Sequence, residues 1–421
     1  MDHPATLDEW LAWIERQHPE AIELGLERVR EVAARMGLGR PARRVATVAG
    51  TNGKGSTVAF IEAIAREAGL RTGAYTSPHL LAYNERVRID GRQADDGALA
   101  GAFAAVEAAR GGVPLTYFEF GTLAALWLFE RAGLDLAILE VGLGGRLDAT
   151  NLVDADVAVI TTVDLDHQEW LGADREDIGA EKAAIARPWR PLVLGEDDPP
   201  ASVLRHAYGI GASTIRAGCD FFADPAEGGR WVWRELNYAL ELPLPALAAP
   251  VQLRNAATAI AALRALDLEI PEEAIARGVA GARLPGRLQC FERDGVLVAV
   301  DVGHNPQAAR ELDAWLRASP VNGRTRVVYA ALADKDVAAV VGAVTGVDAW
   351  HFAGTLEAGT RGLDAATLEA RLRGTVVDGR YHDDVDAALD AALAGSAAGD
   401  RILVFGSFHA AAVALRRLSG G

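Results

Sequence analysis

The chain has 421 residues, half of them hydrophobic, and its 58 acidic and 42 basic side chains give a formal net charge of −16. This length predicts two or three domains, and the hydrophobic fraction predicts a folded globular protein. The negative charge argues against a nucleic-acid partner, which favours a basic face, and requires local positive groups to bind any anionic substrate.

The cysteines and the N-terminus indicate the compartment. Cys219 and Cys290 are far apart and lack the spacing of metal ligands, which fits a reducing compartment. The first ten residues lack a basic segment followed by an apolar run, so we expect no signal peptide. No stretch approaches the roughly 18 apolar residues that a membrane span requires. We therefore expect a cytoplasmic protein with no membrane partner.

The first 200 residues alternate between strand-like and helical patterns, after helical sequence within residues 7–37. This alternation predicts a parallel sheet with helices on both faces. Such sheets bind ligands at the carboxyl ends of their strands. The predicted strands are 45–49, 72–76, 134–141, 156–163 and 191–195, and the predicted helices are 56–69, 95–110, 119–133 and 176–187.

The pattern changes in the second half of the chain. Residues 212–245, with alternating apolar positions around Trp231 and Trp233, predict an antiparallel patch at the edge of the first domain. Pro285 and Gly286 interrupt regular secondary structure in residues 284–287, which we interpret as a hinge between the two domains. The further predicted elements are helices at 252–266 and 272–282, and strands at 296–301, 325–331, 349–353 and 401–405.

Together these elements predict an α/β protein of two domains. Residues 1–286 are expected to form an ATPase domain of the phosphate-loop type with a mostly parallel sheet. Residues 287–421 are expected to form a smaller, Rossmann-like α/β domain.

The most informative segment is a glycine-rich turn between a strand and a helix. An apolar run, Val45–Ala49, leads into Gly50-Thr51-Asn52-Gly53-Lys54-Gly55-Ser56. Glycines let several backbone N–H groups converge on one anion, and the following helix adds the positive end of its dipole. Lys54 can neutralise phosphate oxygens and Ser56 can ligate Mg²⁺. The segment predicts a nucleoside triphosphate site, although Val48 replaces the first glycine of the common pattern, and an ordinary glycine turn is the alternative.

Three further residues are candidates for chemistry in the first domain. Glu140 ends a predicted buried strand, where a carboxylate is costly unless it is paired or binds a metal. The alternative is a core Glu paired with Arg146 or Lys182. His167 closes the next predicted strand and is either a second metal ligand or a structural imidazole. Lys182 lies in an apolar helical stretch and binds a phosphate, pairs with Glu140, or is an ordinary surface lysine.

Two polar segments follow strands of the second domain, Asp301–Pro306 and Phe405–His409. Polar groups at the end of a strand and before a helix are typical of a site. The alternative for the first segment is a capping turn, with Asn305 as N-cap and Pro306 at the first helical position. Both interpretations can hold together.

Collected together, these motifs resemble those of the folylpolyglutamate synthase/dihydrofolate synthase family, within the Mur-type ATP-dependent amide ligases. The matching segments, which extend over most of the chain, are 50–56, 76–80, 84–87, 116–119, 140–151, 166–167, 181–182, 284–287 and 301–306. The usual Asp-Gly-Ala-His-Asn-Pro of the family reads Asp-Val-Gly-His-Asn-Pro in the last segment. Segments 76–87 and 148–149 are similar to those of the bifunctional bacterial type.

The resemblance implies a reaction. The family joins L-glutamate to a pterin-linked carboxylate at the expense of ATP. The γ-phosphoryl group moves onto the carboxylate, the glutamate amine attacks the acyl phosphate, and phosphate leaves. Both steps gather negative charge, so the protein mainly positions groups and neutralises charge.

The resemblance also implies metal ligands and a modified lysine. Ser56 and Glu140 would hold one Mg²⁺ at the β- and γ-phosphates. Glu140, His167 and Lys182 would hold a second, nearer the acceptor. Because an ammonium cannot ligate a metal, Lys182 is hypothesised to be carbamylated by CO₂, as the similar lysine of the family is. Lys54, Glu140, His167 and Lys182 form the expected catalytic set.

The remaining expected contacts follow by similarity. Asn255, Arg287 and Asp301 would contact the base, phosphates and ribose of the nucleotide, and closure at the hinge would bring Arg287 to the phosphates. His304 and Ser407 would help to hold glutamate or nucleotide. The expected pterin-side residues are Ser77, Pro78, His79, Arg86, Thr116, Phe118, Asp148 and Ala149, and Phe118 could stack on the pterin ring.

Two other functions are open. A cell-wall Mur ligase would share the fold and the phosphate loop, but it carries an extra N-terminal domain, and Thr76–Leu80 argues against it. A nucleotide-switched binding protein would not need Glu140, His167 and Lys182 as a group. We expect a monomer whose partners are small molecules: ATP, L-glutamate, and dihydropteroate or folate.

Overall fold

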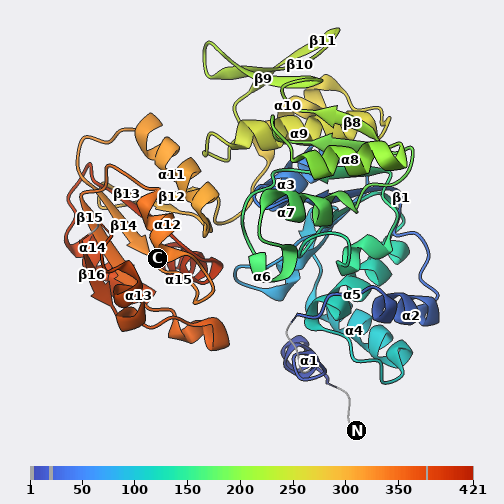
Figure 1. The fold of residues 1–421 in the computed structure, drawn as a ribbon, viewed down its shortest axis with the longest axis horizontal. Coiled ribbons are helices and arrows are strands. Elements are labelled where there is room, and N and C mark those ends of the chain that lie inside the picture. The colour runs from blue at the N-terminus through green and yellow to red at the C-terminus, as the bar shows by residue number, and fades with distance from the viewer. Residues whose placement is uncertain (1–3, 19–21, 376–377, 421) are drawn as a thin grey trace. The chain divides into compact units, whose positions relative to one another are not determined.

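The computed structural model describes residues 4–18, 22–375 and 378–420. Residues 1–3, at the start of the segment used to exclude a signal peptide, and residues 19–21, within the predicted helical stretch 7–37, lie outside the described residues. The chain forms two compact units (Figure 1). Unit 1 comprises residues 1–246 and 253–282, and unit 2 comprises residues 247–252 and 283–421.

Unit 1 is built on a mostly parallel sheet. Within the described residues the strand order is β4-β3-β2-β5-β1-β6-β7-β8, and only β3 and β4, at one edge, run antiparallel to their neighbours. The strands are β1 (Ala42–Ala49), β2 (Thr72–Tyr75), β3 (Val87–Ile89), β4 (Arg92–Gln93), β5 (Leu134–Glu140), β6 (Val157–Ile160), β7 (Pro191–Leu194) and β8 (Ser213–Arg216). The prediction of a parallel sheet is confirmed.

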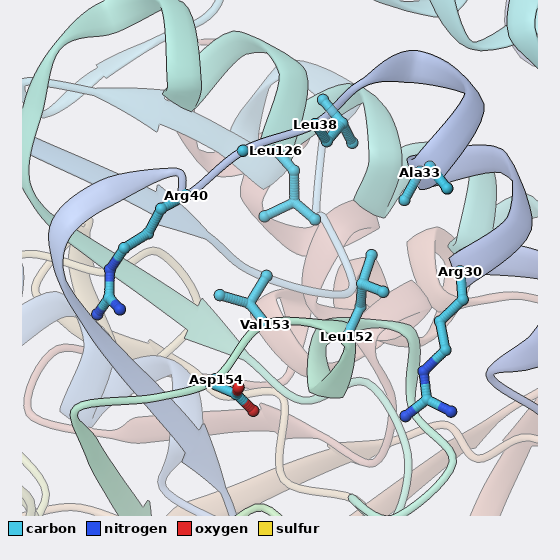
Figure 2. Close-up of a pocket in the computed structure, with 10 residues that line it drawn as sticks. Arg30, Ala33, Leu38, Arg40, Leu126, Leu152, Val153 and Asp154 are labelled. Carbon is cyan, nitrogen blue, oxygen red and sulfur yellow. The ribbon is translucent and has the colours of Figure 1, made fainter.

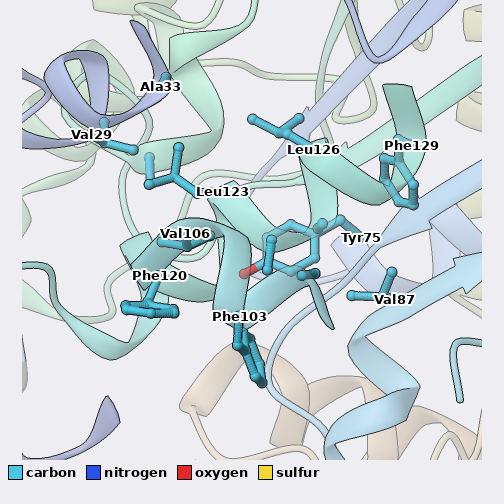
Figure 3. Close-up of a cluster of buried hydrophobic side chains, with 14 of the residues drawn as sticks. Val29, Ala33, Tyr75, Val87, Phe103, Val106, Phe120, Leu123, Leu126 and Phe129 are labelled. Carbon is cyan, nitrogen blue, oxygen red and sulfur yellow. The ribbon is translucent and has the colours of Figure 1, made fainter. Parts of the chain in front are cut away.

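Helices cover both faces of this sheet. Helices α1 (Leu7–Ile14), α2 (Glu27–Met36), α4 (Asp96–Arg110) and α5 (Tyr117–Ala132) pack with residues of β1, β2 and β5 in one buried cluster (Figure 3), in which Tyr75, Phe103, Phe120 and Phe129 are fully buried. Helix α3 (Lys54–Glu67) contacts the same strands and shares no residue with this cluster, so it covers the opposite face.

Helices α10 (Glu272–Gly281) and α3 lie in close contact. A Cβ at Gly278 would be only 2.5 Å from Ile64 Cα, so this approach requires glycine. Helices α7 (Arg175–Ala183) and α8 (Ala201–Ile210) pack against β6 and β7 in a second apolar cluster.

A small antiparallel sheet follows the main sheet of unit 1. It consists of β9 (Phe221–Ala226), β10 (Arg230–Glu235) and β11 (Tyr238–Pro243). Trp231 and Trp233 are fully buried, and Trp233 Nε1 donates to Ala257 O of α9 (Gln252–Ala265) at 3.1 Å. The prediction of an antiparallel patch is therefore confirmed for residues 221–243. It is wrong for residues 213–216, which form the parallel edge strand β8.

Unit 2 is a second, smaller α/β unit. Within the described residues its strand order is β12-β13-β17-β14-β15-β16, and only the β12–β13 pair is antiparallel. The strands are β12 (Gln289–Arg293), β13 (Val296–Val300), β14 (Thr325–Tyr329), β15 (Ala349–Ala353), β16 (Gly379–His382) and β17 (Arg401–Phe405). The helices are α11 (Pro306–Ala318), α12 (Val337–Gly342), α13 (Ala365–Leu372), α14 (Val385–Ala394) and α15 (Phe408–Ser419).

The predicted α/β class is confirmed in both units, but two strands of unit 2 were not predicted. Strands β12 and β16 lie at the two edges of the sheet, and their residues are only partly buried. Their sequences, Gln-Cys-Phe-Glu-Arg and Gly-Arg-Tyr-His, therefore lack the apolar run that marks a central strand. Among the described helices, none combines the length and apolarity needed to cross a bilayer.

Candidate active site

The glycine-rich loop lies in close contact with two other elements of unit 1. Gly50 follows β1 with φ +152°, and a Cβ there would be 1.8 Å from Thr161 Oγ1, just after β6. Gly53 has φ +88°, and a Cβ there would be 2.6 Å from Asn255 Oδ1 of α9. Only glycine meets both the backbone and the space requirements at these positions. Asn255, expected to contact the nucleotide, thus lies directly beside the phosphate loop.

Helix α3 begins at Lys54, directly after the N-cap Gly53. Lys54 Nζ donates to Gly50 O at 2.9 Å and to Thr51 O at 3.2 Å, so the ammonium lies over the loop itself. Ser56 is buried in the first turn of α3. The loop therefore places an ammonium, a hydroxyl and the positive end of a helix dipole together, the combination that binds phosphate.

Glu140 lies on the strand next to this loop. Residue pairing between β5 and β1 sets Glu140 opposite Val48, two residues before Gly50. The carboxylate is 4% exposed and accepts a hydrogen bond from Ser77 N at 3.3 Å. Arg146, suggested as its alternative partner, instead pairs with Glu181 at 2.9 Å. The ends of β1, β5 and β2 thus bring the phosphate loop, Glu140 and Ser77 to one edge.

Lys182 is a buried cation near the phosphate loop. It is 4% exposed on α7, which rules out an ordinary surface lysine. Burial and, to a smaller extent, repulsion from Lys54 lower the pKa of Lys182 to about 7, against the opposite influence of Asp166, Asp148 and Glu181. A large fraction of this amine is consequently neutral near pH 7, and a neutral amine is a nucleophile.

His167 lies farther along the chain from β6 than predicted. The strand ends at Ile160, and His167 is the N-cap of the short helix α6 (Gln168–Leu171) with φ +53°. The prediction that His167 closes the strand is therefore wrong. Its backbone N–H donates to Asp166 Oδ1 at 2.9 Å, its Nε2 is 3.9 Å from the same oxygen, and its side chain is one-third exposed.

An ion pair that the sequence analysis missed supports this segment. Glu196 accepts from Val163 N at 3.0 Å and from Arg175 Nη2 at 3.0 Å, and Arg175 Nε donates to Val163 O at 2.8 Å. Burial raises the pKa of Glu196 to about 7. The available signal was an acid directly after the predicted strand 191–195, the same signal that identified Glu140.

The expected pterin-side residues cluster around the start of α5. Thr116 caps this helix by accepting from Glu119 N at 3.3 Å. The half-buried Phe118 ring lies 5.8 Å from the Tyr75 ring. A Cβ at Gly142 would be 2.7 Å from Phe118 Cζ, so Gly142 leaves the space that this ring occupies.

Asp148 shapes the loop that follows β5. It is fully engaged within the loop, where it accepts from Gly142 N and Leu143 N, both at 2.9 Å, and from Thr150. Burial raises the pKa of Asp148. The next residue, Ala149, is buried at the start of the short helix η2 (Ala149–Leu152).

Segment 76–87 adds a cation to this side of unit 1. Thr76 N donates to Arg86 O at 2.9 Å, which ties the two ends of the segment together. Arg86 Nε donates to His79 Nδ1 at 2.9 Å, whereas Pro78 is exposed. The Arg86 guanidinium lies 5.3 Å from the centroid of the Tyr83 ring.

The expected nucleotide-contacting residues of unit 2 lie at the carboxyl end of β13. Asp301 is buried and accepts from Leu288 N at 2.9 Å and from Gly303 N at 2.7 Å. Burial raises the pKa of Asp301, and the nearby Arg287 acts in the opposite direction. Arg287 also lies 5.5 Å from the centroid of the Phe408 ring.

Capping groups dominate the rest of this edge. Asn305 is the N-cap of α11 and accepts from Ala308 N at 2.9 Å, so the predicted capping turn is confirmed. His304 Nδ1 lies 3.0 Å from Val302 O. Ser407 caps α15 and donates to Ala330 O at 2.8 Å.

A further candidate in unit 2 was missed. Lys335 follows β14, its side chain is 8% exposed, and its Nζ lies 3.7 Å from Asp334 Oδ2. Lysine is rare in this chain: Lys54, Lys182 and Lys335 are its three lysines, against 39 arginines. Two of the three are candidate site residues, and this rarity was the signal that could have identified Lys335.

The described residues can be compared with the usual ligand sets of metal ions. Across residues 4–18, 22–375 and 378–420, no three or more His, Cys, Asp and Glu side chains are grouped so as to hold a metal ion. The expected ligand set includes two residues of these types, since the others are a serine and a lysine.

A cavity of about 400 Å³ in unit 1 is lined by none of the predicted site residues. Leu38, Leu126, Leu152 and Val153 line its middle, with Arg30 and Arg40 near its ends (Figure 2). Arg40 precedes β1, whereas the phosphate loop follows β1, so this cavity lies at the opposite edge of the sheet.

Comparison with known proteins associates this geometry with one family. The family profile "Mur ligase middle domain" matches residues 48–263, and "Mur ligase, glutamate ligase domain" matches residues 286–408. The chain is 48% identical to dihydrofolate synthase/folylpolyglutamate synthase of Escherichia coli over 99% of this chain and 97% of that protein. It is 41% identical to the protein of the same name from Haemophilus influenzae, over 96% of each chain.

Solved structures of proteins from the same family match the fold of this chain. The structure of Escherichia coli FolC in complex with DHPP and ADP matches with a TM-score of 0.93 at 46% identity, covering 99% of this chain and 98% of that one. The bifunctional folylpolyglutamate synthase/dihydrofolate synthase of Yersinia pestis, complexed with AMPPNP and Mn ion, matches with a TM-score of 0.92 at 44% identity, covering 99% and 100%.

Proposed function

The chain belongs to the Mur ligase family, within its dihydrofolate synthase/folylpolyglutamate synthase group, and from this premise we propose how its residues perform the reaction. The protein is an ATP-dependent ligase that adds L-glutamate to dihydropteroate and to tetrahydrofolate through an acyl phosphate. The assignment of the site rests mainly on one observation. The phosphate loop and Glu140 lie at the ends of adjacent strands of unit 1, and the buried Lys182 is close enough to Lys54 for their charges to repel each other.

ATP binding falls to the loop 50–56. The glycines at 50 and 53, which no larger residue could replace, let backbone N–H groups face one anion. Lys54 neutralises phosphate charge, and Asn255, beside Gly53, contacts the nucleotide base. The ADP and AMPPNP complexes of the relatives support the binding of an adenine nucleotide.

The residues present fit a divalent cation. Glu140 is a buried carboxylate one strand away from the phosphate loop, and Ser56 offers a hydroxyl in the first turn of α3. We propose that Ser56 and Glu140 hold one Mg²⁺, and that Glu140, His167 and Lys182 hold a second. The cations neutralise charge on the phosphates and the acceptor carboxylate. The Mn complex of the Yersinia pestis relative supports divalent metal use.

Lys182 suits carbamylation for two reasons. Its pKa of about 7 keeps a large fraction of the amine neutral, which the addition to CO₂ requires. A carbamate would also replace a buried positive charge beside Lys54 by a negative one, and would thereby remove the repulsion between the two lysines. The carbamate oxygens would supply the anionic ligand that an ammonium cannot.

These residues serve both chemical steps. Lys54 and the N–H groups of the loop stabilise the charge that develops as the γ-phosphoryl group passes to the acceptor carboxylate. The amine of L-glutamate then attacks the acyl carbon, and phosphate leaves. Positioning the two reactants supplies much of the rate enhancement.

The pterin side of the site is assigned to the group around α5. We propose that Phe118 stacks on the pterin ring and that Thr116, Ser77, Pro78, His79 and Arg86 surround it. Asp148 and Ala149 act by shaping the adjacent loop, since the Asp148 carboxylate is engaged by backbone N–H groups.

Unit 2 contributes a separate set. We propose that Arg287 and Asp301 contact nucleotide phosphates and ribose, and that His304 and Ser407 help to hold glutamate or nucleotide. The protein is further proposed to act as a cytoplasmic monomer, which light scattering of the purified chain would test.

The assignment is tested by ADP release from purified protein with ATP, Mg²⁺, L-glutamate and dihydropteroate. We expect ADP release that requires both dihydropteroate and L-glutamate, and a glutamylated product by mass spectrometry. A UDP-linked peptide serves as the control acceptor and should give no ADP above background. ADP release with that peptide alone would instead assign the protein to cell-wall synthesis.

A further inference from the structure

His79 has an unusual hydrogen-bond partner. Its Nδ1 lies 2.9 Å from Arg86 Nε, and a guanidinium can only donate. Nδ1 must therefore accept, which leaves it without a proton. If the imidazole is neutral, its proton lies on Nε2.

The Arg86 guanidinium itself lies against two aromatic rings. It lies 5.3 Å from the Tyr83 ring centroid and 5.4 Å from that of Tyr117, and these two rings contact each other edge to face. Within the described part of the chain, Arg86 forms no ion pair with a carboxylate. The cation is thus fixed by aromatic faces in a half-buried position, and it keeps its full charge beside His79.

The surroundings of His79 keep its ring neutral. Burial lowers the pKa of His79 to about 4, and Arg86 acts in the same direction, against a smaller opposite influence of Glu85. The other titratable groups around the cluster are the phenols of Tyr83, which contacts the His79 ring, and of Tyr117. Burial raises the pKa of both phenols, so they remain neutral.

The second ring nitrogen is available. Among the described residues His79 Nε2 has no hydrogen-bond partner, and the residue is only partly buried. The same segment contacts the catalytic edge, because Ser77 N donates to Glu140 Oε2, and the bond from Thr76 N to Arg86 O ties Arg86 to this point. His79 Nε2 is therefore an unused hydrogen-bonding group on a segment that is tied to Glu140.

We propose that Arg86, held against the paired rings of Tyr83 and Tyr117, locks His79 as the Nε2–H tautomer, and that this N–H donates to an oxygen or ring-nitrogen acceptor of the bound pterin substrate. His79 is then a binding residue and Arg86 a positioning residue. The identity of the ligand rests on the proposed function, whereas the tautomer does not.

The tautomer is tested without any substrate. Long-range ¹H–¹⁵N NMR of the full chain, labelled on histidine, should show a His79 ring with protonated Nε2 and unprotonated Nδ1 from pH 8 down to pH 5.5. The His79→Gln spectrum identifies the signal by its loss. In Arg86→Met the ring should lose this fixed tautomer and titrate at higher pH. A wild-type ring that is protonated on Nδ1, or that titrates near pH 6.5, would overturn the proposal.

Matched variants test the donor. The side-chain N–H of Gln reaches approximately the place of Nε2–H, whereas Asn reaches only the place of Nδ1. We expect the Kd for dihydropteroate, measured by calorimetry, to rise about tenfold in His79→Asn and about two- to threefold in His79→Gln, with the Kd for ADP unchanged in both. Equal losses in the two variants would overturn the donor role. Wild-type protein that shows the predicted tautomer but binds no dihydropteroate would overturn the proposed function and not the tautomer.

Discussion

The carboxyl edges of the two sheets use polar residues in opposite ways. In unit 1, the edge formed by β1, β5 and β2 holds a buried amine, Lys182, and a buried carboxylate, Glu140, next to a second amine, Lys54. In unit 2, Asn305 and Ser407 cap helices, and Asp301 binds two backbone N–H groups.

The difference separates two kinds of strand-end polar residue. Capping groups complete backbone hydrogen bonds and stabilise the fold. A buried charge such as that of Lys182 destabilises the apo fold and is kept where chemistry needs it. Substitutions at the two edges should consequently have opposite effects on activity and stability.

The largest expected effect is the loss of activity on changing Lys182. We expect Lys182→Ala to lower kcat by about 10²- to 10³-fold, because it removes the proposed ligand of a cation that neutralises charge on the phosphates and the acceptor. Lys182→Arg keeps a cation but cannot be carbamylated, so it should be as inactive as Lys182→Ala. The measurement is steady-state ADP release with dihydropteroate and L-glutamate.

Small carboxylates sharpen this prediction. Acetate or formate should partly restore the activity of Lys182→Ala and leave Lys182→Arg inactive, because the arginine still fills the space. Substantial activity in Lys182→Arg would contradict the carbamate and indicate that a cation suffices. A fully active Lys182→Ala would remove Lys182 from the catalytic set.

The next effect is a dependence on pH and CO₂. Only the neutral amine adds CO₂, and burial places the pKa of Lys182 at about 7. Below that pH the neutral fraction falls about tenfold per unit, so activity in bicarbonate-buffered solution should fall with the same slope. Raising the bicarbonate concentration should move the midpoint of this activity profile to lower pH. Glu196 also has a pKa of about 7, but a midpoint caused by its titration would not depend on bicarbonate. Acetate-rescued Lys182→Ala should lack this bicarbonate-dependent step.

The contrast between the two edges also explains how far sequence reasoning reached. The phosphate loop was predictable because its glycines and Lys54 are contiguous, and Glu140 because it ends an apolar run. Periodicity placed the central strands of both sheets, but β12 and β16 were missed because edge strands carry polar residues.

The remaining features depend on the contacts that individual residues make in the folded chain. The bond from Arg175 to Glu196, which supports the segment before His167, joins residues 21 positions apart, and its only signal was the place of Glu196 directly after a predicted strand. The hydrogen bonds from backbone N–H groups to the Asp148 carboxylate are local, but no residue pattern in that loop predicts them. His167 was placed too close to β6 because the polar turn between Ile160 and α6 reads as the end of a strand. The sequence did not decide whether Lys182 is buried, since a lysine in a helix is usually exposed.

A smaller effect is a gain in stability at the edge of unit 1. Lys182→Met should raise the free energy of unfolding by about 1–2 kcal/mol near pH 7 in CO₂-free buffer, because it removes a buried charge. The folded-state pKa of about 7 lies below the ordinary 10.5, so the unfolded chain binds more protons between these values, and wild-type stability rises with pH across this window. The gain should therefore shrink from pH 7 to pH 10. Urea unfolding at several pH values measures it, and a loss of stability at pH 7 would show that the amine is favourably paired.

The smallest expected effect is a loss of stability at the edge of unit 2. Asn305→Ala removes the side chain that accepts from Ala308 N at the start of α11, and it should cost about 1 kcal/mol in unfolding free energy. Asn305→Asp keeps an acceptor at the same place, so it should cost only a few tenths of a kcal/mol. Thermal unfolding followed by circular dichroism compares the two variants with the wild type. Because the cap acts on the fold, kcat should stay within about threefold in both variants, against the loss of about 10² or more expected for Lys182. A large fall in kcat for Asn305→Asp with unchanged stability would mean that this edge, like that of unit 1, holds its polar groups for chemistry.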